Sequence, residues 1–98
     1  MIEITNHVEQ DVTINSDANL HGMISGNVSI EKPAVFMVHG MVNGNITIQN
    51  NSTLIVHGTI NGNIINMGHC KIFGMVDGSL IENGGKFDID PKAQISSR

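Results

Sequence analysis

A nine-residue segment at positions 38–46, VHGMVNGNI, returns as VHGTINGNI at positions 56–64, a step of eighteen residues. The segments LHGMISGNV at 20–28 and IFGMVDGSL at 72–80 extend the series, and ITNHVEQDV at 4–12 keeps its apolar positions without its glycines. Units of this length stack on their neighbours, because one unit cannot bury its apolar face alone. The repeat therefore predicts a column of similar coils.

Inside each copy the apolar residues recur at steps of four, as in Val38, Val42 and Ile46, with further apolar residues two positions away, such as Ile48. A period of two is typical of strands, and the step of four indicates a strand interrupted by a corner. We reject a helix, because no segment sustains helical spacing and Gly, Asn and β-branched residues dominate. Each coil should contain three short strands.

The copies vary in length at one corner. Their starting residues are separated by 16, 18, 18, 16 and 17 positions and are Ile4, Leu20, Val38, Val56, Ile72 and Ile89. We place the variation at the corner that reads EKPAV, QNNST, NMGH and ENGGK in successive coils, whereas Gly recurs at the two corners that close tightly. Equivalent residues of stacked coils should lie about 4.8 Å apart.

The predicted fold is all-β: a single-domain triangular parallel β-helix, or β-solenoid, over residues 1–98, with about five coils of 16–18 residues. The coils cover approximately residues 2–19, 20–37, 38–55, 56–71 and 72–95.

The charge and the cysteine content exclude several classes of partner. A formal net charge of −4, with five Lys and Arg residues that do not cluster, lacks the basic surface of a nucleic-acid or anionic-membrane binder. No glycine-rich loop leads into a helix, so we predict no nucleotide site and no cofactor. One cysteine, without a leader or a long apolar run, favours the cytoplasm.

The segments HGMISGNVSI, HGMVNGNITI and HGTINGNI resemble the repeat of bactofilins, a bacterial polymer-forming cytoskeletal family. The pattern GxVxGxI with trailing apolar alternation covers almost the whole chain. The resemblance implies a right-handed parallel β-helix whose copies join end to end into filaments, without nucleotide, through their terminal coils. It favours the right-handed coil, a choice that residue spacing alone leaves open.

Left-handed hexapeptide-repeat β-helices, many of them acyltransferases, are the alternative family. Apolar residues do fall at every sixth position from Ile24 to Ile60, but Asn66 breaks that register, and coils of 16 residues do not divide into it. Acyltransferase chemistry also needs a catalytic histidine at a subunit interface and a donor site. We therefore predict that the chain is not an enzyme and has no catalytic residues.

Histidines recur at one corner of successive coils, at His21, His39 and His57. Imidazole is the commonest metal ligand in proteins. Stacked neighbours would nevertheless point in parallel about 4.8 Å apart, whereas zinc ligands converge at about 2.0–2.1 Å on one ion. Because Phe73 also ends the series, we favour a solvent-facing stack over a metal site.

His69 and Cys70 are adjacent and could suggest a nucleophile with its base. Neighbouring residues of a strand point to opposite faces, so the thiol and the imidazole should diverge. Cys70 occupies the position of Leu54 in the preceding coil. We therefore expect Cys70 in the core.

Asn66 and Glu82 take the positions that Ile30 and Ile48 hold in the longer coils. A buried carboxylate beside an amide would be a candidate acid or base with a raised pKa. Because the corner of the shorter coils starts earlier, we expect both side chains to turn outward instead.

The ends of a solenoid are open strand edges, which proteins either cover or use for pairing. We expect a non-enzymatic scaffold that self-associates through its terminal coils or a flat β-face. The alternative is a protein-binding or inhibitor module that neutralises another protein, and a degenerate acyltransferase-like protein is a distant third. The interface candidates, including a methionine series interrupted by Thr59, are Ile2, Ile4, Val8, Met23, Met41, Met75, Phe87, Ile89 and Ile95.

Overall fold

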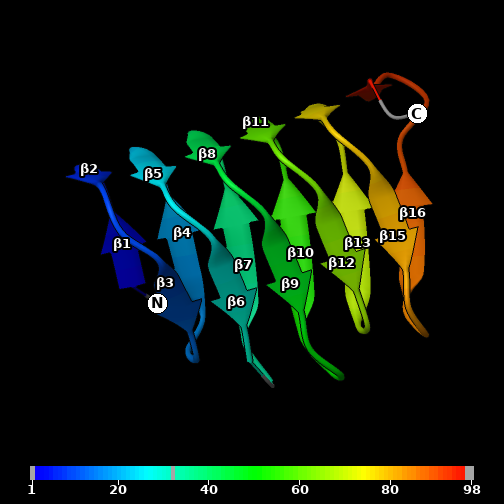
Figure 1. Ribbon diagram of the computed structural model, residues 1–98, viewed down its shortest axis with the longest axis horizontal. Coiled ribbons are helices and arrows are strands. Elements are labelled where there is room, and N and C mark those ends of the chain that lie inside the picture. The colour runs from blue at the N-terminus through cyan, green and yellow to red at the C-terminus, as the bar shows by residue number, and fades with distance from the viewer. Residues whose placement is uncertain (1, 32, 97–98) are drawn as a thin grey trace.

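The computed structural model of the chain describes residues 2–31 and 33–96, which form seventeen short β-strands and no helix (Figure 1). No helix in this part of the chain could therefore cross a membrane. Sheet A contains β1 (Ile2–Ile4), β4 (Ala18–Leu20), β7 (Val35–Val38), β10 (Thr53–Val56), β13 (His69–Ile72) and β16 (Lys86–Ile89). Sheet B contains β2 (His7–Val8), β5 (Met23–Ser25), β8 (Met41–Asn43), β11 (Thr59–Asn61), β14 (Met75–Asp77) and β17 (Gln94–Ile95). Sheet C contains β3 (Val12–Ile14), β6 (Val28–Ile30), β9 (Ile46–Ile48), β12 (Ile64–Asn66) and β15 (Leu80–Glu82).

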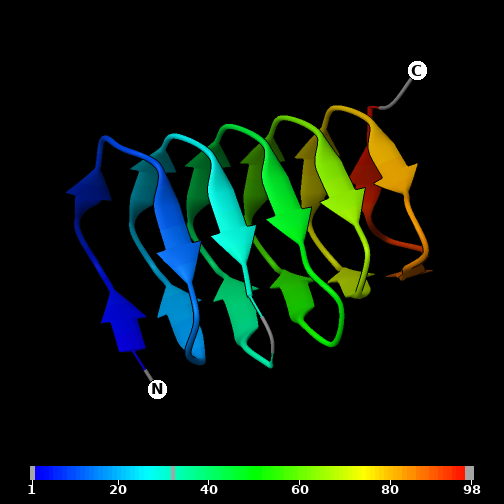
Figure 2. The ribbon, with the colours of Figure 1, turned by 60° about the horizontal axis from the view of Figure 1, so that its bottom comes forward.

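The three sheets are the sides of one column, because consecutive strands enter sheets A, B and C in turn. Each strand from β4 to β14 pairs in parallel with the strands three places before and after it. Figures 1 and 2 show the coils side by side along the longest axis, with the two termini at opposite ends. The described residues form five complete coils and two strands of a sixth, so the predicted β-solenoid is confirmed.

The path of the chain gives the hand of the coil. In Figure 2 the chain descends through the strands of sheet C in front and rises behind them, while it advances from the N-terminal to the C-terminal end. This path is right-handed, as the usual crossover between parallel strands is.

The predicted ladders lie in register. In sheet A, equivalent positions pair in the order Ile4, Leu20, Val38, Val56, Ile72 and Ile89. In sheet B the order is Val8, Ile24, Val42, Ile60, Val76 and Ile95, and in sheet C it is Val12, Val28, Ile46, Ile64 and Leu80. These columns point inward, because alternate residues of each strand face the same side. Their central members form the buried core, whereas the members at the two ends of the column are only partly buried or exposed.

Within the complete coils, the corners differ in length as the sequence predicted. The corner between sheets C and A spans residues 49–52 after β9, 67–68 after β12 and 83–85 after β15. The corner between sheets A and B has two residues in these coils, and a Cβ at Gly58 would collide there with the carbonyl oxygen of Gly40 in the preceding coil. In the sixth coil the same corner, residues 90–93, is longer and closes on Asp90, whose Oδ1 accepts a hydrogen bond from Lys92 N at 2.8 Å.

Candidate functional site

The histidine series lies along the outer corner between sheets A and B. His21, His39 and His57 stack with ring centroids 5.0 and 5.1 Å apart and planes within 6°, and Phe73 continues the stack at 5.0 Å. The parallel rings place their nitrogens side by side rather than around one point. Within residues 2–31 and 33–96, no group of three or more His, Cys, Asp and Glu side chains is arranged to hold a metal ion.

A carboxylate lies at the N-terminal end of this stack. His21 Nε2 lies 3.0 Å from Oε1 of Glu3, while Asn19 Nδ2 donates to Oε2 of the same carboxylate at 2.9 Å. The amide of Asn19, with the nearby His21, holds the pKa of Glu3 below its usual value. The side chains of Glu3 and His21 are both about half exposed, so the contact between them contributes little to stability.

The methionine series runs beside the aromatic stack, on the outer face of sheet B. Met23, Met41, Thr59 and Met75 pair in register, and Met75 is 42% exposed. A shallow hollow of about 310 Å³ lies between the two series where Thr59 replaces methionine. The series therefore lies on the side of the column and not at its ends.

Cys70 is fully buried, and its neighbours in the register are Leu54 and Phe87. His69 precedes it on the outer face of sheet A, so the predicted divergence of the two side chains and the core position of Cys70 are confirmed. Burial raises the pKa of the thiol to about 12. A thiol that stays protonated at neutral pH is a poor nucleophile.

The raised pKa of Cys70 predicts a loss of stability in alkali. Its contribution is fully present below the unfolded pKa of 9.0 and is lost as the pH rises toward 12, because the unfolded chain releases the proton first. From pH 8 to pH 10 the free energy of unfolding should fall by about 1.4 kcal/mol more for the natural chain than for Cys70→Ala. Urea titrations at the two pH values measure this difference, and equal falls in both proteins would contradict it.

Asn66 corrects one sequence prediction, since it points inward and is fully buried. Glu82 is exposed, but it lies in register with Asn66 on β15, the last strand of sheet C. Asn66 pairs in register with Ile48, but the two-residue corner that follows it brings backbone groups close to its side chain. Its Nδ2 donates to the carbonyl oxygen of Lys86 at 2.8 Å, and its Oδ1 accepts from Gly68 N at 3.0 Å. Burial is therefore tolerated because both ends of the amide are satisfied.

A second series of asparagines joins successive coils at the corner between sheets B and C. The Oδ1 atom of Asn27 accepts from Asn45 N at 3.0 Å, and that of Asn45 accepts from Asn63 N at 2.9 Å. On sheet B, Asn61 Nδ2 donates to Asn43 Oδ1 at 2.8 Å. The first two bonds hold the backbone of the next coil, and the third joins side chains of neighbouring coils, which accounts for asparagine at these positions without a ligand.

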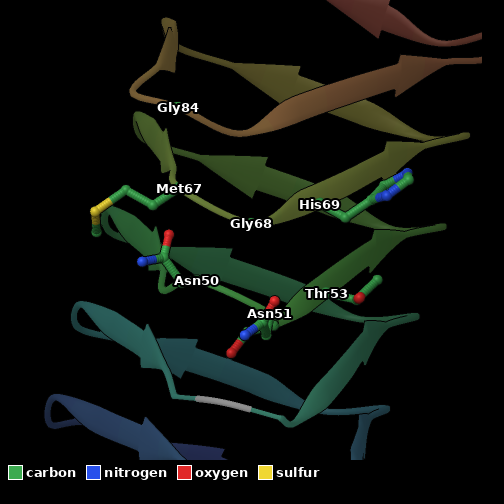
Figure 3. Close-up of a pocket in the computed structure, with 8 residues that line it drawn as sticks. Asn50, Asn51, Thr53, Met67, Gly68, His69 and Gly84 are labelled. Carbon is green, nitrogen blue, oxygen red and sulfur yellow. The ribbon is translucent and has the colours of Figure 1, made fainter.

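The unequal corners between sheets C and A leave an open depression of about 600 Å³ (Figure 3). Its lining contains no Asp, Glu, Lys or Arg and consists of Asn50, Asn51, Ser52, Thr53, Met67, Gly68, His69 and Gly84. In Figure 3, His69 and Thr53 point to the same side, away from Asn50, Asn51 and Met67. Thr53 and His69 are neighbours in the register, but Nε2 of His69 has no hydrogen-bond partner among the described residues, so the imidazole is not held against a hydroxyl through that nitrogen.

Several interface candidates lie at the two ends of the column. Ile2 is 53% and Ile89 44% exposed, and the half-buried members of these ends are Ile4, Val8, Phe87 and Ile95. Met23, Met41 and Met75 instead lie on the side of the column. A further apolar side chain, Ile81, was not predicted from the sequence and is 43% exposed on the outer face of sheet C, although its outward position follows from the inward position of Leu80.

Comparison of the chain with protein-family models, with curated proteins and with solved structures finds no match. The features that can indicate a function are therefore the ends of the column, its outer faces and its corners.

Proposed function

We propose that this protein is a non-enzymatic structural scaffold, similar to bactofilins, whose copies associate end to end in the bacterial cytoplasm. The observation that carries the proposal is the exposure of apolar side chains at both ends of the column. Ile2 and Ile89 are 53% and 44% exposed, whereas Phe36 in the column of Ile2 is 0% exposed. A second copy that covered such a side chain would gain up to about 1.5–3 kcal/mol for each one.

The strand edges support the same association. In the described residues, β1, β2 and β3 have a paired strand on one side only, and so do β15, β16 and β17. Unpaired edges of this kind are templates for further strands. Pairing between copies would extend the parallel sheets and satisfy the backbone groups that these edges present.

The charges favour contact between unlike ends. Residues 2–17 contain Glu3, Glu9, Asp11 and Asp17 and no Lys or Arg, whereas residues 80–96 contain both signs of charge, namely Lys86 and Lys92 with Glu82, Asp88 and Asp90. Two N-terminal ends would bring only acidic groups together, and like charges across an interface are unfavourable. Contact of one N-terminal end with one C-terminal end is heterologous, and it produces open filaments when it does not close into a ring.

The area available makes a single contact weak. The Cα extents across the column, 24 and 19 Å, limit an end face to about 460 Å². Two such faces bury less than the 1,200–2,000 Å² or so of a standard stable interface. The association should therefore depend strongly on concentration.

The test is light scattering coupled to size-exclusion chromatography over a range of concentrations. The natural chain should form oligomers or filaments without added ligand, and Ile2→Glu and Ile89→Glu should each shift it to monomer. Ile55→Glu places a charge on the outer face of sheet A, and Thr47→Glu places one on the outer face of sheet C, both in the middle of the column. These two controls should still assemble, and circular dichroism should show that all four variants are folded.

One observation favours a second candidate function, that of a module that binds another protein. The outer face of sheet A presents a patch of half-buried apolar side chains in its central strands, Val35, Met37 and Ile55. Such a flat patch could dock on another protein, as in an inhibitor that neutralises its partner. A natural chain that stays monomeric at high concentration would reject the scaffold and favour this binding module.

A further inference from the structure

The chain contains three Asn–Gly dipeptides, Asn43–Gly44, Asn61–Gly62 and Asn83–Gly84. Asparagine is thermolabile because the backbone nitrogen of the next residue can attack its side-chain carbonyl carbon. Glycine in the next position favours this attack, since it has no Cβ to obstruct it and the widest choice of backbone angles. The attack also requires a free N–H group and a side chain that can rotate, and these differ between the three dipeptides.

The first two dipeptides are held by hydrogen bonds. Gly44 N donates to the carbonyl oxygen of Asn61 at 3.0 Å, and Gly62 N donates to that of Asp77 at 3.1 Å. The Asn61 side chain donates to Asn43 Oδ1 at 2.8 Å, so both asparagines are also restrained through their amides. Reaction at either site must first break these bonds and separate the stacked coils.

In the third dipeptide, both reacting groups, the backbone N–H of Gly84 and the side chain of Asn83, are accessible. Asn83 N and Gly85 N both donate to the carbonyl oxygen of Asn66, at 2.9 and 3.1 Å, while Gly84 N between them has no hydrogen-bond partner in residues 2–31 and 33–96. Asn83 and Gly84 are exposed, and no atom lies within 4 Å of the position that a Cβ on Gly84 would take. Gly84 borders the open depression of Figure 3.

We infer that Asn83 is a site of spontaneous deamidation in the folded protein. Gly84 N forms a bond to Asn83 Cγ, the bond from Cγ to the side-chain nitrogen breaks, and that nitrogen leaves as ammonia with the proton that Gly84 N gives up. One water molecule then opens the cyclic imide at either carbonyl. The products are aspartate or isoaspartate at position 83, with no oxidant, reductant or enzyme required.

The modification changes the corner in two ways. Either product adds a negative charge beside Glu82. Isoaspartate also lengthens the backbone by one methylene between Asn83 N and Gly85 N, the two donors that share the carbonyl oxygen of Asn66. The reaction therefore loosens the attachment of the last complete coil to the one before it.

Mass spectrometry of the intact 98-residue protein, aged at mildly alkaline pH and then fragmented, tests the inference. Because the other sites must break at least one backbone hydrogen bond and local packing, Asn83 should react about tenfold faster, or more, than Asn43 and Asn61. Equal rates in the folded protein, or a faster reaction at Asn43 or Asn61, would overturn the assignment.

Two controls distinguish protection of the asparagines by the folded structure from the intrinsic reactivity of the Asn–Gly dipeptide. In denaturing urea the three sites should react at similar rates, because each has the same two residues at its centre; a preference for Asn83 that persisted unchanged in urea would reject a role for the fold. The variant Asn83→Gln should lose the main product while keeping the urea midpoint, since the side chain is exposed. Persistence of the main product in Asn83→Gln would place the reaction elsewhere.

Discussion

Replacement of Gly58 by alanine is expected to lower the free energy of unfolding by about 3 kcal/mol or more. The added Cβ would collide with the carbonyl oxygen of Gly40 and would lie 2.8 Å from the carbonyl carbon of His39. Both obstacles are backbone, and the same carbonyl of Gly40 accepts a hydrogen bond from Thr59 N at 3.0 Å. The coils must separate or the corner must change shape, and Gly58 has paired coils on both sides, which prevents relief by fraying.

Urea unfolding of Gly58→Ala and Gly84→Ala measures this effect against a matched control. Gly84 has φ +88°, but no atom lies within 4 Å of the place that the alanine methyl group would occupy, so alanine there costs only the backbone strain of about 1–2 kcal/mol. Equal losses in the two variants would show that backbone angle, and not the close approach of the coils, accounts for glycine at the corner.

Replacement of Asn66 by alanine is expected to cost about 3 kcal/mol, the second largest effect. The change leaves the carbonyl oxygen of Lys86 and the N–H of Gly68, whose bonds to Asn66 are part-buried, without their partner, and each lost partner costs about 1–3 kcal/mol. Exposed Glu82, at the equivalent position of the next coil, provides the control. Glu82→Ala should change stability by no more than about 0.5 kcal/mol.

A corner graft tests the reason for Asn66. In the coil of β9 the same position is Ile48, and its corner is two residues longer. Replacing the sequence NMG at 66–68 with IQNNS from 48–52 should restore most of the stability that Asn66→Ala loses, because the longer corner no longer needs the amide. A graft no more stable than Asn66→Ala would contradict this explanation.

The coil, its register and most of its core could be predicted from the residue pattern alone. The repeat and the period of two predicted that Val38 and Val56 would be paired and buried and that Cys70 would follow Leu54 inward, and the structure confirms each position. Stacked units make this possible, because equivalent residues meet the same surroundings in every coil. The equal spacing of the histidines likewise predicted their stack.

The places where the repeat is interrupted could not be predicted in this way and depend on the three-dimensional structure. A shorter corner could turn Asn66 outward or fold the backbone onto its amide. The choice depends on Gly68 in the corner that follows Asn66 and on Lys86 at the start of β16, twenty residues further along the chain. The same holds for the three Asn–Gly dipeptides, which are identical in sequence and differ in whether a neighbouring coil holds the glycine N–H. Hydrogen bonds between coils at unequal corners are set by the local path of both backbones, and a residue pattern does not contain that information.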